Sequence, residues 1–520
     1  MARTAAGVAL LGLGVLQLGA TGQVLQRDEI NEAVRLAMDV ELPNAGYETF
    51  RGKLFWQQDH IADQDGYYGQ VKMGEDGWGT ADALCDYWKQ NAAFFKTTCN
   101  YTFPLAQSEA IVSFIKTPPP AEYFGVQSLV FLRNVSEIPM SGIADAHNHL
   151  NLRLDPSAES RFGQPFVMIT TGDQNTLAYV KDSLAKTGVP EYLINEDLID
   201  VVHMTYPYDP TTYKFTSYPW DLYQILARLN GVPEDDALKA YLAEGRPVWK
   251  VTAPQDKAFA AVAYPGRKTR GTGGKDTELH LQKSMRKLGA AVEKALAVES
   301  AASHVNADVP LEFTVTDDEK CLTDPTYTPV FNANPFMNTT AMGSCDRFTN
   351  DALYTLSPNG KAFGNFLFER ERGFVWYGVN NNATGKATFV NFMVTEGASD
   401  GSRRNFEAPD HSPFISANDM VGSARAWAQG AIADADADQL FAWRFARECP
   451  PGHPWSQYCT VVDLEMINPT SYAYFIGRSY LETATATGAA PEECLVSHVL
   501  CYEQPHRRVG GGGQAAAAPS

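Results

Sequence analysis

Eight cysteines fall in four closely spaced pairs, and this spacing constrains which loops of the chain can be closed covalently. The pairs are Cys85/Cys99, Cys321/Cys345, Cys449/Cys459 and Cys494/Cys501. An even number of cysteines predicts disulfides when a protein folds in an oxidising compartment. A zinc site is the alternative, but no CxxC motif occurs and the pairs are spread along the chain. We therefore expect four local disulfides.

The N-terminus is typical of a protein that enters such a compartment. One basic residue, Arg3, precedes an apolar run over residues 8–18, and small residues follow at 20–22. The run is too short to cross a bilayer and suits the core of a signal peptide. We expect residues 1–22 to be a signal peptide and the mature chain to begin near Gln23. No transmembrane segment is expected after it, because every later apolar run is interrupted early.

Four sequons also favour the secretory pathway. They begin at Asn100, Asn134, Asn338 and Asn382, and each predicts an N-glycosylation site if the source is a eukaryote. The predicted location is therefore secreted or extracellular. The Gly- and Ala-rich residues 506–520 predict a disordered tail.

The charge balance excludes two classes of partner. The chain has 42 Lys and Arg against 61 Asp and Glu, which gives a net charge of −19. Such an acidic protein repels nucleic acid and anionic membranes. Its 520 residues, 44% of them hydrophobic, can bury a large core and predict two or three domains.

The middle of the chain alternates between strand and helix patterns. Strands are predicted at 110–115, 127–132, 166–169, 198–204 and 248–251, and helices at 177–184, 221–229 and 234–243. This order predicts an α/β domain over 106–262, with a mainly parallel sheet and flanking helices. Residues 23–105 before it predict a helix and then an aromatic, Gly-rich region closed by the first cysteine pair.

The remainder of the chain has a different character. Residues 263–276 are basic and Gly-rich, which predicts an exposed loop. Residues 277–505 predict a β-rich α+β domain that begins with an amphipathic helix at 281–296. Apolar runs at 373–379 and 386–394 flank a turn sequence and predict a hairpin.

Two histidines in the sequence Asp145-Ala-His147-Asn-His149 are the sharpest candidate for a metal site. Imidazoles at positions i and i+2 of a strand point to one side and can share an ion. The pair resembles the HxH motif on the first strand of amidohydrolase-type barrels, which implies a bound divalent metal and hydrolysis. His203 is a candidate third ligand, and Asp145 is a further candidate beside the two histidines. The alternative is a polar loop or strand end whose histidines form structural hydrogen bonds.

A second candidate lies between a predicted strand and the next helix. It comprises Thr170, Thr171, Gly172, Asp173, Gln174 and Asn175. Backbone N–H groups at a helix N-terminus favour a carboxylate, phosphate or polar ligand. The alternative is an ordinary connecting loop in which Asp173 caps the helix.

Three functional hypotheses follow from these patterns. The first is a secreted or cell-surface glycoprotein that binds a small solute, for capture or uptake, in a crevice of the α/β domain. The second is a secreted metal-dependent hydrolase that uses the HxH motif. The third is a structural glycoprotein that contacts carbohydrate or another protein.

Overall fold

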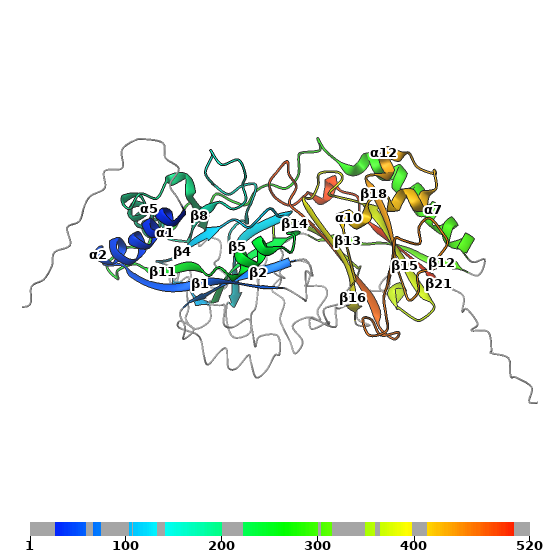
Figure 1. Ribbon diagram of the computed structural model, residues 1–520, viewed down its shortest axis with the longest axis horizontal. Helices are drawn as coiled ribbons and strands as arrows, with labels where there is room; N and C mark the ends of the chain where they lie inside the picture. Colours follow the sequence, from blue (N-terminus) through cyan, green and yellow to red (C-terminus); the bar gives the residue numbers. More distant parts are fainter. Residues whose placement is uncertain are drawn as a thin grey trace, which may run out of the picture.

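The first half of the chain builds one large sheet, and the second half builds two smaller sheets beside it (Figure 1). The computed structural model describes residues 27–58, 66–73, 103–106, 108–132, 141–199, 222–299, 303–314, 349–358, 364–397 and 413–503. Of these residues, 37% lie in strands and 24% in helices. The protein is therefore mostly β-sheet.

The first sheet is a mixed sheet in which antiparallel pairs predominate. Its strands are β1 (Glu48–Gln58), β2 (Gly66–Met73), β3 (Phe103–Pro104), β4 (Glu109–Lys116), β5 (Tyr123–Leu132), β6 (Ser141–Gly142), β7 (His147–Asn148), β8 (Pro165–Thr171), β9 (Ile194–Leu198), β10 (Leu222–Asn230) and β11 (Arg246–Thr252). They follow the order β6-β5-β10-β2-β1-β11-β4-β8-β9, with β3 beside β10 and β7 beside β5. Only β8 and β9 pair in parallel among its described strands.

This arrangement contradicts the predicted α/β domain with a mainly parallel sheet. A strand-helix-strand unit is present at β8, α5 (Gln174–Lys186) and β9, but the neighbouring pairs are antiparallel. The predicted helix at 221–229 is also wrong, because this segment is strand β10. Leu222, Ile225, Leu226 and Leu229 have helical spacing, which concealed a two-residue alternation of apolar and polar side chains.

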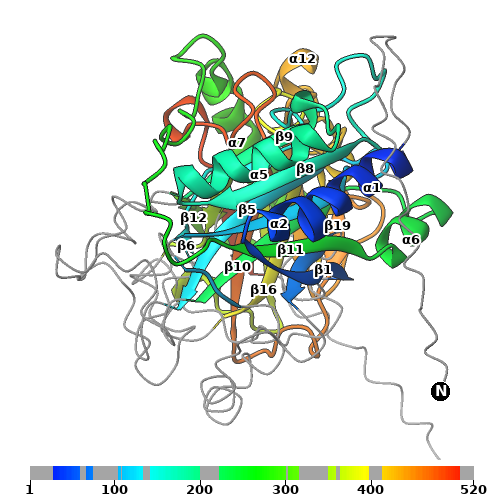
Figure 2. The ribbon, with the colours of Figure 1, turned by 90° about the vertical axis from the view of Figure 1, so that its left-hand side faces the viewer.

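Helices cover one part of this sheet. Helix α1 (Arg27–Leu36) continues through a π-helical turn (Ala37–Glu41) into α2 (Leu42–Asn44). Together with α5, these helices lie across the sheet at β11, β4 and β8 (Figure 2). Their buried apolar side chains pack on those of the strands, so burial of apolar area fixes the helices there.

Two five-stranded sheets form a sandwich in the second half. The first has the order β12-β21-β15-β18-β19 and the second β13-β14-β20-β16-β17. Their strands are β12 (His304–Pro310), β13 (Glu312–Thr314), β14 (Ala352–Leu356), β15 (Arg372–Val379), β16 (Phe389–Gly397), β17 (Phe414–Ser416), β18 (Leu440–Ala446), β19 (Cys459–Val461), β20 (Tyr472–Tyr480) and β21 (His498–Glu503). Aromatic side chains such as Trp376, Phe392 and Phe475 fill the space between the sheets.

The outer face of the first of these sheets carries helices. The predicted amphipathic helix is present as α7 (Gln282–Glu299), and its apolar stripe packs on β15 and β21. Short helices α11 (Ser423–Ala428) and α12 (Asp434–Ala437) pack in the same cluster. Helix α10 (Ala417–Met420) packs on the core between the sheets, and α6 (Asp236–Ala243) belongs to the first half. The predicted hairpin is wrong, because β15 and β16 belong to different sheets.

Residues 263–276 connect the halves and are fastened to both of them. Arg267 donates to the carbonyl of Gly142 (2.7 Å), next to β5. Arg270 donates to the carbonyl of Ala352 (2.9 Å) in β14. We call residues 263–276 the strap, because its side chains hold the two halves together although part of its surface is exposed.

The cysteines are only partly paired as expected. The Cys449–Cys459 disulfide is confirmed. Cys494 and Cys501 are buried free thiols, so this predicted pairing is wrong in the structure. Cys85, Cys99, Cys321 and Cys345 lie outside the described residues. Among the described helices, none is long and apolar enough to span a membrane.

Replacing both Cys449 and Cys459 with serine should lower the free energy of unfolding by about 2–3 kcal/mol, because the bond closes a short loop in the unfolded chain. Urea unfolding of both proteins measures the change. Added reductant should destabilise the wild type more than the double variant. Peptide mapping that recovers Cys494 joined to Cys501 would contradict the assignment of free thiols.

Candidate functional site

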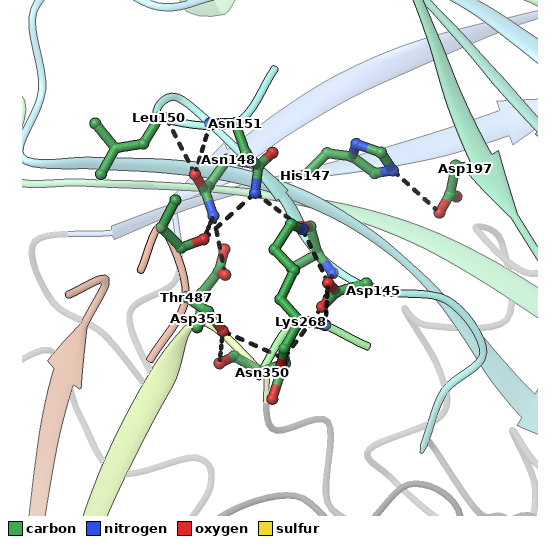
Figure 3. Close-up of polar contacts among 12 residues, drawn as sticks. Asp145, His147, Asn148, Leu150, Asn151, Asp197, Lys268, Asn350, Asp351 and Thr487 are labelled. Carbon is green, nitrogen blue, oxygen red and sulfur yellow. Dashed lines mark hydrogen bonds and ion pairs between the residues drawn. The ribbon is translucent and has the colours of Figure 1, made fainter. Parts of the chain in front are cut away.

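The two halves meet at a buried carboxylate, Asp351, which directly precedes β14 (Figure 3). The hydroxyl of Tyr123 donates to its Oδ2 atom (3.0 Å), and the side-chain amide of Asn148 donates to Oδ1 (3.0 Å). Tyr123 begins β5 and Asn148 ends β7, so both donors come from the first sheet. Asn148 also donates to the carbonyl of Ala486 (2.8 Å). Asp351 therefore links the first sheet to the sandwich.

A second carboxylate, Asp145, connects the strap to the same junction. The Lys268 ammonium contacts its Oδ2 atom at 2.9 Å, and the Asn350 amide donates to Oδ1 at 3.1 Å. Burial alone would raise the pKa of Asp145, but Lys268 and Asn350 lower it below its ordinary value. Asn350 also donates to the hydroxyl of Thr487 (3.2 Å). This carboxylate is therefore charged and fully engaged in the junction.

Asp351 differs electrostatically from Asp145. Burial raises the pKa of Asp351 to about 7, and the negative charge of Asp145 acts in the same direction. The hydrogen bonds from Asn148 and Tyr123 and the charge of Lys268 oppose this shift without cancelling it. Near neutral pH, Asp351 therefore exists in both its protonated and its charged form.

The two histidines of the HxH motif face different surroundings. The Nε2 atom of His147 lies 3.7 Å from Oδ1 of Asp197, too far for a hydrogen bond. His149 accepts from the backbone N–H of Phe124 (3.3 Å), and its ring packs on Phe162. These contacts fit histidines that form structural contacts better than histidines that share a metal ion.

Burial governs the charge of these groups. It lowers the pKa of His147 and raises that of Asp197, although each partner's charge acts in the opposite direction. Burial also lowers the pKa of His149 to about 4. Ser128 and Thr170 donate to Oδ2 of Asp197, but its Oδ1 atom is buried without a hydrogen-bond partner.

The structure does not assemble the predicted metal ligands among the residues it describes. In those ranges, no group of three or more His, Cys, Asp or Glu side chains could hold a metal ion. His203 lies outside them. Asp145 forms an ion pair with Lys268. His147 lies beside Asp197, whereas His149 packs on Phe162.

The loop at Thr170–Asn175 is a connecting loop whose donors are used within the chain. Asp173 caps α5 and accepts from the N–H groups of Asn175 and Thr176. The N–H of Gln174 donates to the carbonyl of Ala260 (2.7 Å). The helix N-terminus is thus closed by the chain itself.

The other loop residues also form hydrogen bonds within the chain. The hydroxyl of Thr170 donates to Asp197 (2.9 Å) and that of Thr171 to the carbonyl of Glu109 (2.8 Å). Gly172 accepts from the N–H of Val262 (3.0 Å). The capping alternative accounts for these contacts.

Of the predicted glycosylation sites, Asn382 alone lies in the described residues. It is exposed in the turn between β15 and β16. Its side-chain nitrogen donates to the carbonyls of Ala387 (3.3 Å) and Thr388 (3.0 Å). A glycan on this nitrogen leaves one N–H, so one of these two bonds can persist.

One face of the first sheet carries a polar group that no sequence motif indicates. Gln70 in β2 and Gln127 in β5 both lie opposite Leu226 of β10. Directly paired residues of antiparallel strands share a face, as do residues two apart on one strand. Gln70, Gln127, Gln224 and Arg228 therefore project from one face. We call the three glutamines the glutamine patch.

The glutamine patch is buried and lacks partners. The exposed fraction is 5% for Gln70, 2% for Gln127 and 0% for Gln224. Five of their six amide atoms have no hydrogen-bond partner: Oε1 of Gln70 and both Oε1 and Nε2 of Gln127 and Gln224. An unsatisfied buried polar group costs about 1–3 kcal/mol. The alternation of Gln224, Arg228 and Asn230 with apolar residues in β10 was the signal that could have revealed this face.

Comparison with known proteins does not identify a family for this chain. No protein-family model matches the chain, and no curated protein is similar to it. The function is therefore inferred from the arrangement of the residues.

Replacing Asp351 with asparagine should remove a pH dependence of stability. The folded protein retains the Asp351 proton up to about pH 7, whereas the unfolded chain releases it near its ordinary pKa of 3.8. The folded state binds more protons between these values, so this contribution to stability falls as pH rises through that window. We expect the wild type to lose about 2–3 kcal/mol relative to Asp351→Asn between pH 5 and pH 8.

Urea unfolding of both proteins over this range measures the difference in their free energies of unfolding. His147 and His149 change stability with pH in the direction opposite to Asp351, but they are present in both proteins, so their contributions cancel in the difference. The fully exposed Asp236 provides the control, since Asp236→Asn should leave the pH profile unchanged. A constant difference between wild type and Asp351→Asn would contradict the assigned titration.

Proposed function

We propose that the protein binds a small polar solute at the glutamine patch. The observation that carries this proposal is the set of five buried amide atoms without partners. Burial without hydrogen bonds is costly, and native proteins keep such groups where a ligand, an ion or water completes them. Three such side chains around one residue, Leu226, offer a cluster of donors and acceptors on a rigid sheet.

The chemistry of the face favours a solute with several hydrogen-bonding groups. Each glutamine amide can donate through nitrogen and accept through oxygen. The Arg228 guanidinium projects from the same face, with its carbon 5.8 Å from the centre of the Tyr68 ring. Binding sites commonly combine a few polar groups with aromatic walls. The proposal keeps solute binding as the function and moves it from the Thr170–Asn175 loop to the sheet.

The metal-dependent hydrolase receives less support. Its two histidines contact different neighbours, and Lys268 occupies Asp145. Metal analysis of the purified protein tests this alternative, because near-stoichiometric zinc or manganese that is lost in His147→Ala would favour it. A purely structural glycoprotein would need neither a ligand nor a metal.

We further propose that the protein works outside the cell after removal of residues 1–22. The apolar N-terminal run and the Cys449–Cys459 disulfide support this location. The protein secreted by a eukaryotic host should begin near Gln23 and lose mass on enzymatic deglycosylation. N-terminal sequencing and mass spectrometry measure both properties, and a retained residue 1 would contradict the proposal.

Replacing Gln224 with methionine should stabilise the protein and abolish solute binding. Methionine has a similar shape and removes two unpartnered polar atoms, so we expect a gain of about 1–3 kcal/mol in the free energy of unfolding. Gln127→Met should behave alike. Thermal unfolding with a panel of sugars, polyols, amino acids and organic acids measures binding, because a ligand of the folded state raises its stability.

Gln174→Met is the matched control, because Gln174 is exposed at the start of α5. It should change neither binding nor stability appreciably. If no solute in the panel raises the wild-type unfolding temperature, the proposal fails whether or not Gln224→Met stabilises the protein.

A further inference from the structure

We propose that Asp351 forms one wall of the glutamine site and that the site binds a carboxylate together with one proton. This inference rests on the proposed function and adds to it the ligand class and a dependence on pH. The second half of the chain would thereby take part in a site whose other walls come from the first sheet.

The position of Gly125 places Asp351 on the face of the glutamine patch. Tyr123, Gly125 and Gln127 alternate along β5 and therefore share one face. A Cβ atom at Gly125 would lie 2.2 Å from the Tyr123 hydroxyl and 3.4 Å from Oδ2 of Asp351. The space above Gly125 is thus filled by these two groups, directly beside Gln127.

Arg228 lies across from the same position. It pairs with Gly125 in the register of β10 and β5, and both residues project toward one side. Asp351 therefore lies above a position that pairs with Arg228 and is two residues from Gln127 along β5. The glutamine patch, a cation and a titratable carboxyl group share this part of the sheet.

The charged and titratable groups around Asp351 come from each element that packs there. They are Tyr123 of β5, Asp145 and His149 on either side of β7, Lys268 of the strap, Arg228 of β10, Tyr354 of β14 and Tyr480 of β20. Asp145 and Lys268 form an ion pair. Burial raises the pKa of Tyr123 well above its ordinary value, so its hydroxyl is neutral at physiological pH. Arg228 and Asp351 therefore set the charge that a ligand on this face meets.

This pair of groups selects for a carboxylate when Asp351 is protonated. A guanidinium attracts a carboxylate through its charge. Charged Asp351 would repel such a ligand, whereas neutral Asp351 can donate its O–H to it. The proton comes from solvent and remains shared between the two carboxyl groups, so no bond in the ligand is broken. Burial keeps this protonation accessible near neutral pH.

Calorimetric titration of the whole protein tests the inference with matched neutral and anionic solutes, glucose against gluconate and glycerol against glycerate. The anionic member should bind more tightly at pH 6, and its Kd should rise about tenfold per pH unit above pH 7. Titration in two buffers of different ionisation enthalpy should show uptake of nearly one proton at pH 8.5 and almost none at pH 5.5. Uptake of no proton at either pH would overturn the inference.

Two variants separate a binding role of Asp351 from a structural one. Asp351→Asn should bind the anionic solute with the same affinity from pH 6 to 8.5. Asp145→Asn should move the midpoint of the wild-type pH dependence downward, because the charge of Asp145 raises the pKa of Asp351. If Asp351→Asn does not fold, the midpoint measured for Asp145→Asn and the proton uptake of the wild type still test the binding role of Asp351.

The outcomes distinguish this inference from the proposed function. Binding of neutral solutes alone, without pH dependence, would leave the glutamine site standing and refute the role of Asp351. A full pH dependence in Asp351→Asn would also refute it. If no solute binds to the wild type but Gln224→Met still stabilises the protein, the proposed function itself fails.

Discussion

The contact of Tyr123 and Asn148 with Asp351 is the interaction on which the arrangement of the two halves depends. It buries a carboxyl group between a sheet and a sandwich whose main cores are separate, next to a small apolar cluster that Tyr123 shares with Tyr354 and Tyr480. The absence of a side chain at Gly125 makes room for it. Tyr123 packs against Tyr480 at a tilted angle, with ring centres 4.7 Å apart, and surrounds this polar contact with aromatic area.

One face of the first sheet is stabilised by apolar packing under the helices and destabilised by unpartnered amides at the glutamine patch. Helices α1 and α5 cover the strands β4, β8 and β11 with apolar side chains, and the sandwich covers Tyr123. Between these regions lies the glutamine patch, where buried amides have no partners. A protein that only needed to fold would be more stable with apolar residues there, which is why the patch is best understood through binding.

Local structure could be predicted where a single short segment contained the whole pattern of apolar or capping residues. The stripe of α7, the strand β8 and the cap of α5 by Asp173 all follow from short segments. The topology could not be predicted, because strand pairing depends on partners far apart in the chain. Segment 222–230 shows the difficulty, since Leu226 adds a helical spacing to its apolar residues and its polar residues Gln224, Arg228 and Asn230 lie on a buried face of the sheet.

The candidate site was hidden for a related reason. The HxH pattern predicts a shared direction for two imidazoles, but β7 ends at Asn148 and the chain turns, so His149 packs against Phe162. The glutamines belong to three strands and have no motif in common. Only the register of β2, β5 and β10 brings them together.

The bond from Asn148 to Ala486 has a consequence for the biosynthesis of the protein. The two residues are 338 positions apart, and ribosomes add about 5–20 residues per second. Roughly 17–70 seconds therefore separate the synthesis of the two partners. Asp351, the other partner of Asn148 and the partner of Tyr123, is only 203 and 228 positions away from them, so the bond to Ala486 is the last of these contacts to form. The nascent first half is therefore the stage at which a chaperone or a captured solute would have the greatest influence on folding.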